Sequence, residues 1–195
     1  MCPNEVLATI ASLMHIVAFI VYNMQTVSGK NTPSISTWAI WAFLSLFNVA
    51  SYWDMSGDWV KSLLPTIGSL MCIATFFISL CKGKFVKISK SDFAALCVGL
   101  VAVLVWWRYE NATYANLVAQ VCIFIGFMPT YKSVWQNPRN EKPLAWFLWT
   151  SAYIVGIVVV LLRWNNQYQD IVYYADCIVL HLIVALLALR KGGSS

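Results

Sequence analysis

Long apolar runs separated by short polar segments dominate the chain. They cover roughly residues 5–26, 35–54, 60–81, 91–109, 113–134, 143–163 and 169–190. Each run is close to the roughly 20 residues that a helix needs to cross about 30 Å of hydrocarbon. Because lipid offers no hydrogen bonds to the backbone, each run is predicted to be a helix. We therefore expect an all-α integral membrane protein with seven transmembrane helices.

The composition agrees with a lipid environment. Of the 195 residues, 60% are hydrophobic and only 11% are charged, whereas soluble domains carry about 25% charged residues. A soluble core of this size cannot absorb so much apolar surface, so we expect the bilayer to be the partner of most side chains. The net charge of +5 is small and dispersed, which argues against a nucleic-acid partner.

The basic residues are distributed unevenly between the two sides of the predicted membrane. Ten of the 13 fall in segments on one side: Lys30, Lys82, Lys84, Lys87, Lys90, Lys132, Arg139, Lys142, Arg190 and Lys191. Only Lys61, Arg108 and Arg163 belong to the other side. The positive-inside rule then predicts an outside N-terminus and a cytoplasmic C-terminus, which requires an odd number of spans.

The two ends of the chain resemble each other. The landmarks that recur after 108 or 109 residues are Tyr22 and Tyr131, Trp38 and Trp146, Trp41 and Trp149, and the segments 80–83 and 189–192. We expect two three-helix repeats, residues 1–83 and 111–192, joined by a loop and a linking helix in 84–110, with a flexible tail at 193–195. Three is odd, so a linking helix makes both repeats enter the membrane in the same sense, as in some transporters.

A 3+1+3 chain with this orientation resembles the SWEET and PQ-loop transporters. The segment that carries the likeness reads Phe127-Met128-Pro129-Thr130-Tyr131, then Trp135, Lys142-Pro143, Trp146 and Trp149. Like the PQ-loop region, it places a proline in the first helix of a repeat, then a short loop and a tryptophan-bearing helix. It departs from that pattern at Thr130, where the family has Gln, and the first repeat has no proline in its first span. The resemblance implies a fold and a transport role. Similarity to small bacterial seven-span proteins implies the bacterial inner membrane.

Three ionisable residues fall within the predicted spans. A charge at the membrane centre costs about 2.5–3.5 kcal/mol on insertion scales and usually marks a function. Asp176 is therefore a candidate substrate-contacting or protonatable group in a central cavity, with His181 and His15 as candidate partners. Histidine titrates near neutral pH, which suits proton coupling. The alternatives are a neutral carboxylic acid bonded between helices, a wet interfacial carboxylate, and structural histidines.

Amides and prolines form a second group of candidates. Asn48, Asn116 and Gln120 lie at membrane depth, and the last two share one helix face. They either bind solute or hold helices together, at about 1 kcal/mol each. Pro129 and Pro65 interrupt two spans, so each is a candidate hinge or a static kink.

Four tryptophans occupy repeat-related positions, namely Trp38, Trp41, Trp146 and Trp149. Each pair is three residues apart and therefore lies on one helix face. Aromatic cavities with a few polar groups suit flat or sugar-like solutes. Cavity lining and interfacial anchoring both remain open for these residues.

The leading hypothesis is a small-solute transporter that works by alternating access, with proton coupling left open. The alternative is a seven-span receptor or accessory protein that binds a ligand without transport. An intramembrane enzyme using Asp176 with His15 or His181 is disfavoured, because paired carboxylates and metal-ligand spacings are missing. We accordingly expect a small-molecule substrate, no metal and no cofactor. The sequence leaves open whether copies of the chain form a homo-oligomer.

Overall fold

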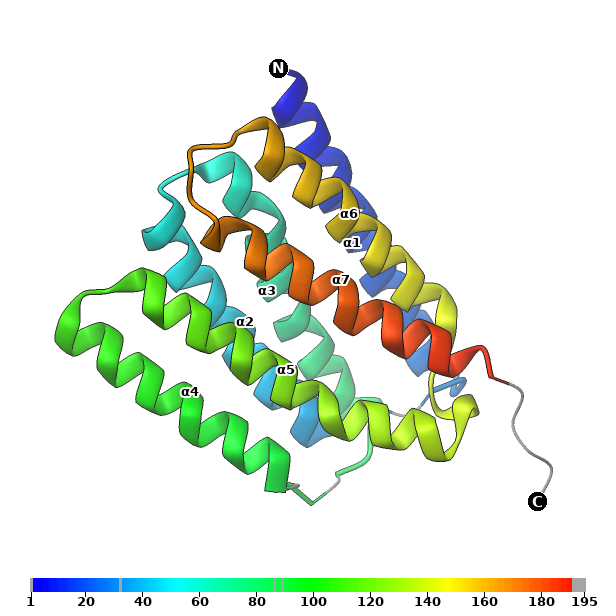
Figure 1. The fold of residues 1–195 in the computed structure, drawn as a ribbon. Coiled ribbons are helices and arrows are strands. Elements are labelled where there is room, and N and C mark those ends of the chain that lie inside the picture. The colour runs from blue at the N-terminus through cyan, green and yellow to red at the C-terminus, as the bar shows by residue number, and fades with distance from the viewer. Residues whose placement is uncertain (1, 32, 86, 89, 191–195) are drawn as a thin grey trace.

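A computed structural model describes residues 2–31, 33–85, 87, 88 and 90–190. Its helices are α1 (Pro3–Val27), α2 (Ile35–Ser56), α3 (Trp59–Lys82), α4 (Lys90–Tyr109), α5 (Ala112–Gln136), α6 (Pro143–Leu162) and α7 (Gln169–Ala188), with a 3-10 turn η1 (Pro138–Asn140) before α6 (Figure 1). The seven predicted runs thus correspond to the seven helices. The predicted tail at 193–195 lies outside the described residues.

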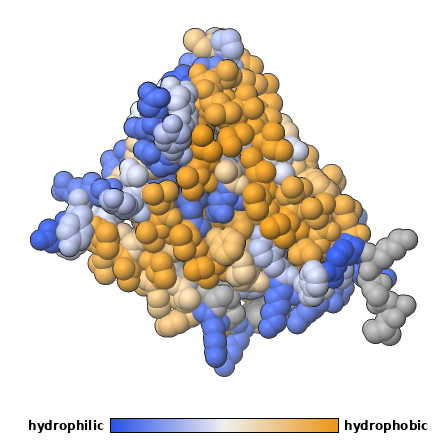
Figure 2. All heavy atoms as spheres, in the orientation of Figure 1, coloured by the Kyte–Doolittle hydropathy of each residue, from blue (hydrophilic) through white to orange (hydrophobic). Residues whose placement is uncertain are grey.

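Six of these helices are long and apolar enough to cross a membrane: α1, α2, α3, α5, α6 and α7. Figure 2 shows a broad apolar surface over the bundle, with polar residues mainly toward its edges. The prediction of an all-α membrane protein is confirmed at this level. In α4 the structure describes the shorter continuous apolar stretch Leu96–Tyr109, so the seventh span at 91–109 stays a prediction.

Capping residues set several of the helix boundaries. The Ser34 hydroxyl accepts a hydrogen bond from the Thr37 N–H and begins α2, and Asp58 and Asn111 cap α3 and α5 in the same way. Such side chains satisfy N–H groups that have no partner within the helix. Gly57 ends α2 with a φ of 60°, a left-handed conformation that glycine adopts without steric cost.

The helices pack in two groups of three. In the first group α3 packs against both α1 and α2, and in the second α7 packs against both α5 and α6. The groups meet where α1 packs against α6 and α2 packs against α5 (Figure 1). Helix α4 lies outside both groups, mainly against α5. The centre of the bundle is therefore enclosed by six helices.

The two ends of the bundle differ in charge. One end, here called the basic end, carries Lys30, Lys84, Lys87 and Arg139 in the loops that follow α1, α3 and α5. The opposite end carries the α2–α3 and α6–α7 connections and is called the Lys61 end. The functional site lies between these two ends.

Candidate functional site

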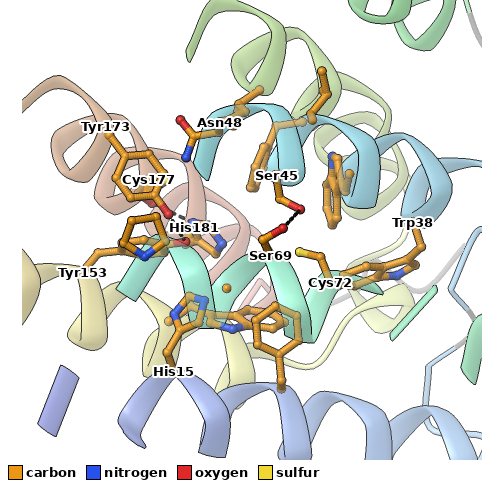
Figure 3. A pocket seen from close by; sticks show the side chains of 18 of the residues that line it. His15, Trp38, Ser45, Asn48, Ser69, Cys72, Tyr153, Tyr173, Cys177 and His181 are labelled. Carbon is orange, nitrogen blue, oxygen red and sulfur yellow. Dashed lines mark hydrogen bonds between the residues drawn. The ribbon is translucent and has the colours of Figure 1, made fainter. Parts of the chain in front are cut away.

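An aromatic cavity of about 80 Å³ lies at the centre of the bundle (Figure 3). Its lining comes from α1, α2, α3, α5, α6 and α7: His15, Phe19, Trp38, Trp41, Leu44, Ser45, Asn48, Pro65, Gly68, Ser69, Cys72, Ile123, Phe127, Trp146, Trp149, Tyr153, Tyr173, Cys177 and His181. None of these lining side chains is an aspartate, glutamate, lysine or arginine. The cavity is therefore suited to an uncharged ligand.

All four predicted tryptophans line this cavity. The ring centroids of Trp38 and Trp41 are 5.0 Å apart, and those of Trp146 and Trp149 are 5.1 Å apart. Phe19 packs on Trp149 at 4.9 Å and Phe127 packs on Trp41 at 5.0 Å, so each tryptophan pair contacts a phenylalanine from the other group of helices. Edge and tilted contacts of this kind hold the rings in fixed orientations.

The two predicted histidines also line the cavity, on either side of Tyr153. The Tyr153 ring centroid lies 5.1 Å from that of His15 and 5.1 Å from that of His181. The Nδ1 atom of His181 is 2.7 Å from the Cys177 carbonyl oxygen. Because a carbonyl oxygen only accepts, this contact places a proton on Nδ1, and in the neutral form of the ring Nε2 is then an acceptor.

Two polar nitrogens on lining residues have no hydrogen-bond partner among the described residues. They are Nδ1 of His15 and Nε1 of Trp149, both buried. His15 is held against Gly68, where an added Cβ would lie 3.0 Å from the His15 Nε2 atom. Buried polar groups normally have partners, so each of these nitrogens is a candidate partner for a polar atom of a ligand.

The three predicted amides form one buried cluster, of which only Asn48 lines the cavity. The Asn48 Oδ1 atom accepts hydrogen bonds from Asn116 Nδ2 at 3.0 Å and from Gln120 Nε2 at 2.7 Å. Asn116 Nδ2 also lies 3.1 Å from Ser51 Oγ. Asn116 and Gln120 therefore orient Asn48 and connect α5 to α2, rather than facing the cavity themselves.

Asp176 is not among the residues that line the cavity. Its side chain is half-buried, and its Oδ2 atom is buried without a hydrogen-bond partner among the described residues. The prediction that Asp176 faces a central cavity is therefore not confirmed, although the adjacent residue Cys177 lines the cavity. The two predicted hinge residues lie beside hollows: Pro65 lines the cavity, and Pro129 lines the wider space described next.

A vestibule of about 530 Å³ opens at the basic end. It shares Trp38 and Trp41 with the central cavity, so these rings separate the two spaces. Glu141, in the short connection before α6, lines the vestibule and accepts hydrogen bonds from Trp146 Nε1 at 3.1 Å and Tyr22 Oη at 3.4 Å. Burial raises the pKa of Glu141 to about 7, although these two hydrogen bonds oppose the shift.

A buried ion pair lies at the Lys61 end of the bundle. Lys61 Nζ on α3 lies 2.6 Å from Asp170 Oδ2 on α7, and the two side chains are 1% and 0% exposed. Lys61 Nζ also donates to Asn165 Oδ1 at 3.1 Å, while the Tyr174 hydroxyl donates to the Lys61 carbonyl oxygen. These contacts fasten α3 to α7 and to the α6–α7 connection.

A second ion pair lies nearer the surface of the same end. Arg163 Nε is 2.7 Å from Asp58 Oδ2, with exposures of 30% and 17%. Burial by itself would raise the pKa of Asp58, but the bond from Arg163 and the backbone N–H groups of Val60 and Lys61 outweigh it, so the pKa is lowered. Asp58 thus both caps α3 and connects it to the end of α6.

Sequence reasoning missed Glu141, Lys61 and Asp170. Glu141 gives no signal, because it is a loop residue between basic residues. The Lys61–Asp170 pair does give a sequence signal. Positions 61 and 170 carry opposite charges, lie near the starts of their helices and differ by the repeat offset of 109.

Comparison of the chain with protein-family models, curated proteins and solved structures finds no match. The fold and the site define its class: an all-α membrane protein whose six apolar helices surround an uncharged aromatic cavity.

Proposed function

We propose that this protein is a small-solute transporter that works by alternating access, with the central aromatic cavity as its solute site. The observation that carries the proposal is the unequal access to that cavity. The vestibule reaches its tryptophan wall from the basic end, whereas a fully buried ion pair lies across the Lys61 end. A site closed at one end and approached from the other is what one state of an alternating-access cycle requires.

The lining supports an uncharged, flat solute with hydrogen-bond acceptors. Aromatic walls bind ring faces, and a binding pocket needs only a few placed polar groups to orient its ligand. The unpartnered Trp149 Nε1 supplies a donor, while His181 Nε2 and the Ser45 and Ser69 hydroxyls line the same space. A volume of about 80 Å³ favours a single small ring over a disaccharide in this state.

The packing supports the proposed 3+1+3 arrangement of parallel repeats. In this arrangement α1, α2 and α3 correspond to α5, α6 and α7. The α1–α3 and α2–α3 contacts then have counterparts in the α5–α7 and α6–α7 contacts, and the α1–α6 contact has its counterpart in the α2–α5 contact. The aromatic contacts follow the same rule, since Phe19–Trp149 and Phe127–Trp41 differ by an exchange of the two halves. Motion of one half against the other would alternately open each end.

The proposal keeps the resemblance to SWEET and PQ-loop transporters and the expected topology. The basic end would then face the cytoplasm, because basic loops are retained there. A bacterial inner membrane is the corresponding location. Pro65 beside the cavity and Pro129 beside the vestibule are the proposed bending points of α3 and α5.

Solute flux is the test of this function. Purified protein would first be screened by thermal shift against uncharged ring-containing solutes, because a ligand that binds the folded form raises its apparent stability. The compounds that stabilise the protein would then be measured for uptake into proteoliposomes. Trp149→Phe keeps the ring but removes the unpartnered donor, and Trp107→Phe is the matched control, since Trp107 is 80% exposed.

We expect counterflow of the bound solute in wild-type proteoliposomes, reduced flux and affinity in Trp149→Phe, and wild-type behaviour in Trp107→Phe. Loss of one hydrogen bond corresponds to roughly a two- to tenfold loss of affinity. Binding without any flux would favour a receptor or accessory protein and would refute transport. Equal effects of the two substitutions would refute the cavity as the solute site.

A further inference from the structure

Four cationic side chains from three separate loops line the vestibule. Lys30 follows α1, Lys84 and Lys87 follow α3, and Arg139 lies in η1 after α5. The positive-inside bias accounts for basic residues at one end of a membrane protein. It does not account for their collection around a single hollow of about 530 Å³.

These cations have no carboxylate partner among the described residues. Two ion pairs occur among the described residues, and both lie at the Lys61 end. Glu141 is the one carboxylate among the residues that line the vestibule, and its two oxygens are bonded to Trp146 Nε1 and the Tyr22 hydroxyl. The vestibule is therefore left with uncompensated positive charge, which attracts anions.

The loops that carry the cations are held in place by backbone hydrogen bonds. Lys84 N–H donates to the Pro33 carbonyl at 3.0 Å, and Ile35 N–H donates to the Lys84 carbonyl at 3.0 Å. A Cβ at Gly83 would lie 2.7 Å from the Pro33 carbonyl oxygen, so only glycine permits this approach. The α1–α2 and α3–α4 loops thus form one framework, and the vestibule is a built feature.

The η1 turn is fixed as well. Asn137 Oδ1 accepts the Arg139 N–H at 3.1 Å, and Asn140 Nδ2 donates to Ser133 Oγ at 3.0 Å. These bonds set the backbone of Arg139 at the edge of the hollow. The guanidinium group of an arginine can bind two oxygens of a phosphate at once.

Two further features favour an anion. Asn31 lines the vestibule, is 4% exposed, and has no hydrogen-bond partner for either side-chain atom among the described residues. Helix α2 begins beside it, and Ser34 and Thr37 of its first turn line the same space. The α2 dipole adds partial positive charge at this point. The Ile35 and Thr37 N–H groups already donate to the Lys84 carbonyl and the Ser34 hydroxyl, so hydrogen bonds to an anion would come from side chains.

We propose that the vestibule is a binding site for a phosphate-bearing anion, separate from the central solute cavity. Lys30, Lys84, Lys87 and Arg139 provide the charge, and Asn31 provides hydrogen bonds. The phosphate belongs either to a free metabolite or to a lipid headgroup, since the recognising chemistry is the same. The site does not depend on transport, because it consists of residues outside the cavity lining.

The test measures the stability of the whole protein with inorganic phosphate. Protein in an uncharged detergent is titrated with phosphate, and chloride at equal ionic strength controls for screening. A second arm adds phosphatidylglycerol or, as its control, phosphatidylcholine to the micelles. The vestibule variant is Lys84→Gln/Arg139→Gln. Its matched control, Lys82→Gln/Lys132→Gln, removes two exposed cations of the same end that do not line the hollow.

We expect phosphate or phosphatidylglycerol, but not chloride or phosphatidylcholine, to stabilise the wild type and the Lys82/Lys132 control. The vestibule variant should bind at least about tenfold more weakly, as loss of a charge-assisted hydrogen bond implies. Stabilisation by phosphate identifies a free anion, and stabilisation by phosphatidylglycerol alone identifies a lipid headgroup. The proposal is overturned if neither stabilises the wild type more than its control, or if both double variants lose the response equally.

As a safeguard against misfolding of the double variant, Asn31→Asp would be titrated in parallel. It adds a single negative charge at the proposed contact and leaves all four cations in place. Weaker phosphate binding in a variant of unchanged unliganded stability supports the site. Unchanged phosphate affinity in Asn31→Asp excludes Asn31 from it and overturns the proposal as stated.

Discussion

Removal of either partner of the Lys61–Asp170 ion pair should destabilise the protein strongly. Both side chains are buried, at 1% and 0% exposed, and their charged atoms are 2.6 Å apart. In Asp170→Asn the ammonium loses its counterion and keeps only a weak amide partner together with Asn165 Oδ1 at 3.1 Å. Breaking a buried pair from one side costs about 3–5 kcal/mol, because the remaining charge is uncompensated. Lys61→Met should cost a similar amount.

The double variant Lys61→Met/Asp170→Val separates burial of charge from packing. Replacing both members of a buried pair with apolar side chains of similar size is close to neutral. We therefore expect it to recover most of the loss and to lie within about 1–2 kcal/mol of the wild type. Arg163→Met is the comparison, because the Arg163–Asp58 pair is 30% and 17% exposed and an exposed pair contributes about 0–1 kcal/mol.

The assay is reversible unfolding in mixed micelles, followed by circular dichroism, with the free energy of unfolding compared across the five proteins. The reasoning would be refuted if Asp170→Asn and Lys61→Met each cost less than about 1 kcal/mol, because an uncompensated buried charge costs more than that. It would also be refuted if the double variant lost the sum of the single losses, because additive losses mean that the two groups do not interact.

Three further predictions concern other parts of the molecule. Gly156→Ala should lower the free energy of unfolding by about 1–3 kcal/mol, measured in the same assay, because its Cβ would overlap the buried Tyr174 ring. Glu141 has a folded pKa of about 7 against an ordinary value of 4.5, so its contribution to stability should be complete below pH 4.5 and be lost, by at most about 3 kcal/mol, as pH rises to 7. A wild-type slope between pH 4.5 and 7 equal to that of Glu141→Gln would contradict this. Gly83→Ala should separate the two loops of the basic end, which faster hydrogen exchange of their amides would show and unchanged exchange would refute.

The helices could be predicted from sequence because the membrane imposes simple rules. An apolar run must be a helix in lipid, because its backbone groups find no other hydrogen-bond partners there. The run at 35–54 corresponds to Ile35–Ser56 and the run at 143–163 to Pro143–Leu162. The remaining differences of a few residues come from caps such as Gly57, whose left-handed conformation ends α2 just past the predicted apolar run.

Part of the site was also predictable. The spacing of Trp38 and Trp41 places both on one helix face. The equivalent pair four helices later made a shared aromatic cavity one of the two interpretations. Gln120 lies one turn from Asn116, which anticipated the amide cluster. The second signal depends on amide side chains, which hydrogen-bond across helices in a membrane.

Whether a residue of a given helix faces lipid or the core of the bundle could not be predicted. In a membrane helix the lipid-facing and core-facing positions are similarly apolar, so the periodicity that orients soluble helices is lost. Asp176 and Cys177 are adjacent in α7, yet only Cys177 lines the cavity. Glu141 was missed for a different reason: its burial depends on contacts with Tyr22 and Trp146, and Tyr22 lies 119 residues away.

Accessibility of Cys72 from each side of the membrane tests the central claim most directly. Cys72 lines the cavity on α3, and a variant that keeps only this cysteine would be labelled with a small membrane-impermeant thiol reagent in sealed vesicles of either orientation. The proposed cycle predicts faster labelling from the basic end than from the Lys61 end, and acceleration of the slower reaction in Asp170→Asn. Failure to label from either side, or labelling from one side only that Asp170→Asn leaves unchanged, would contradict a cavity that opens alternately to the two faces.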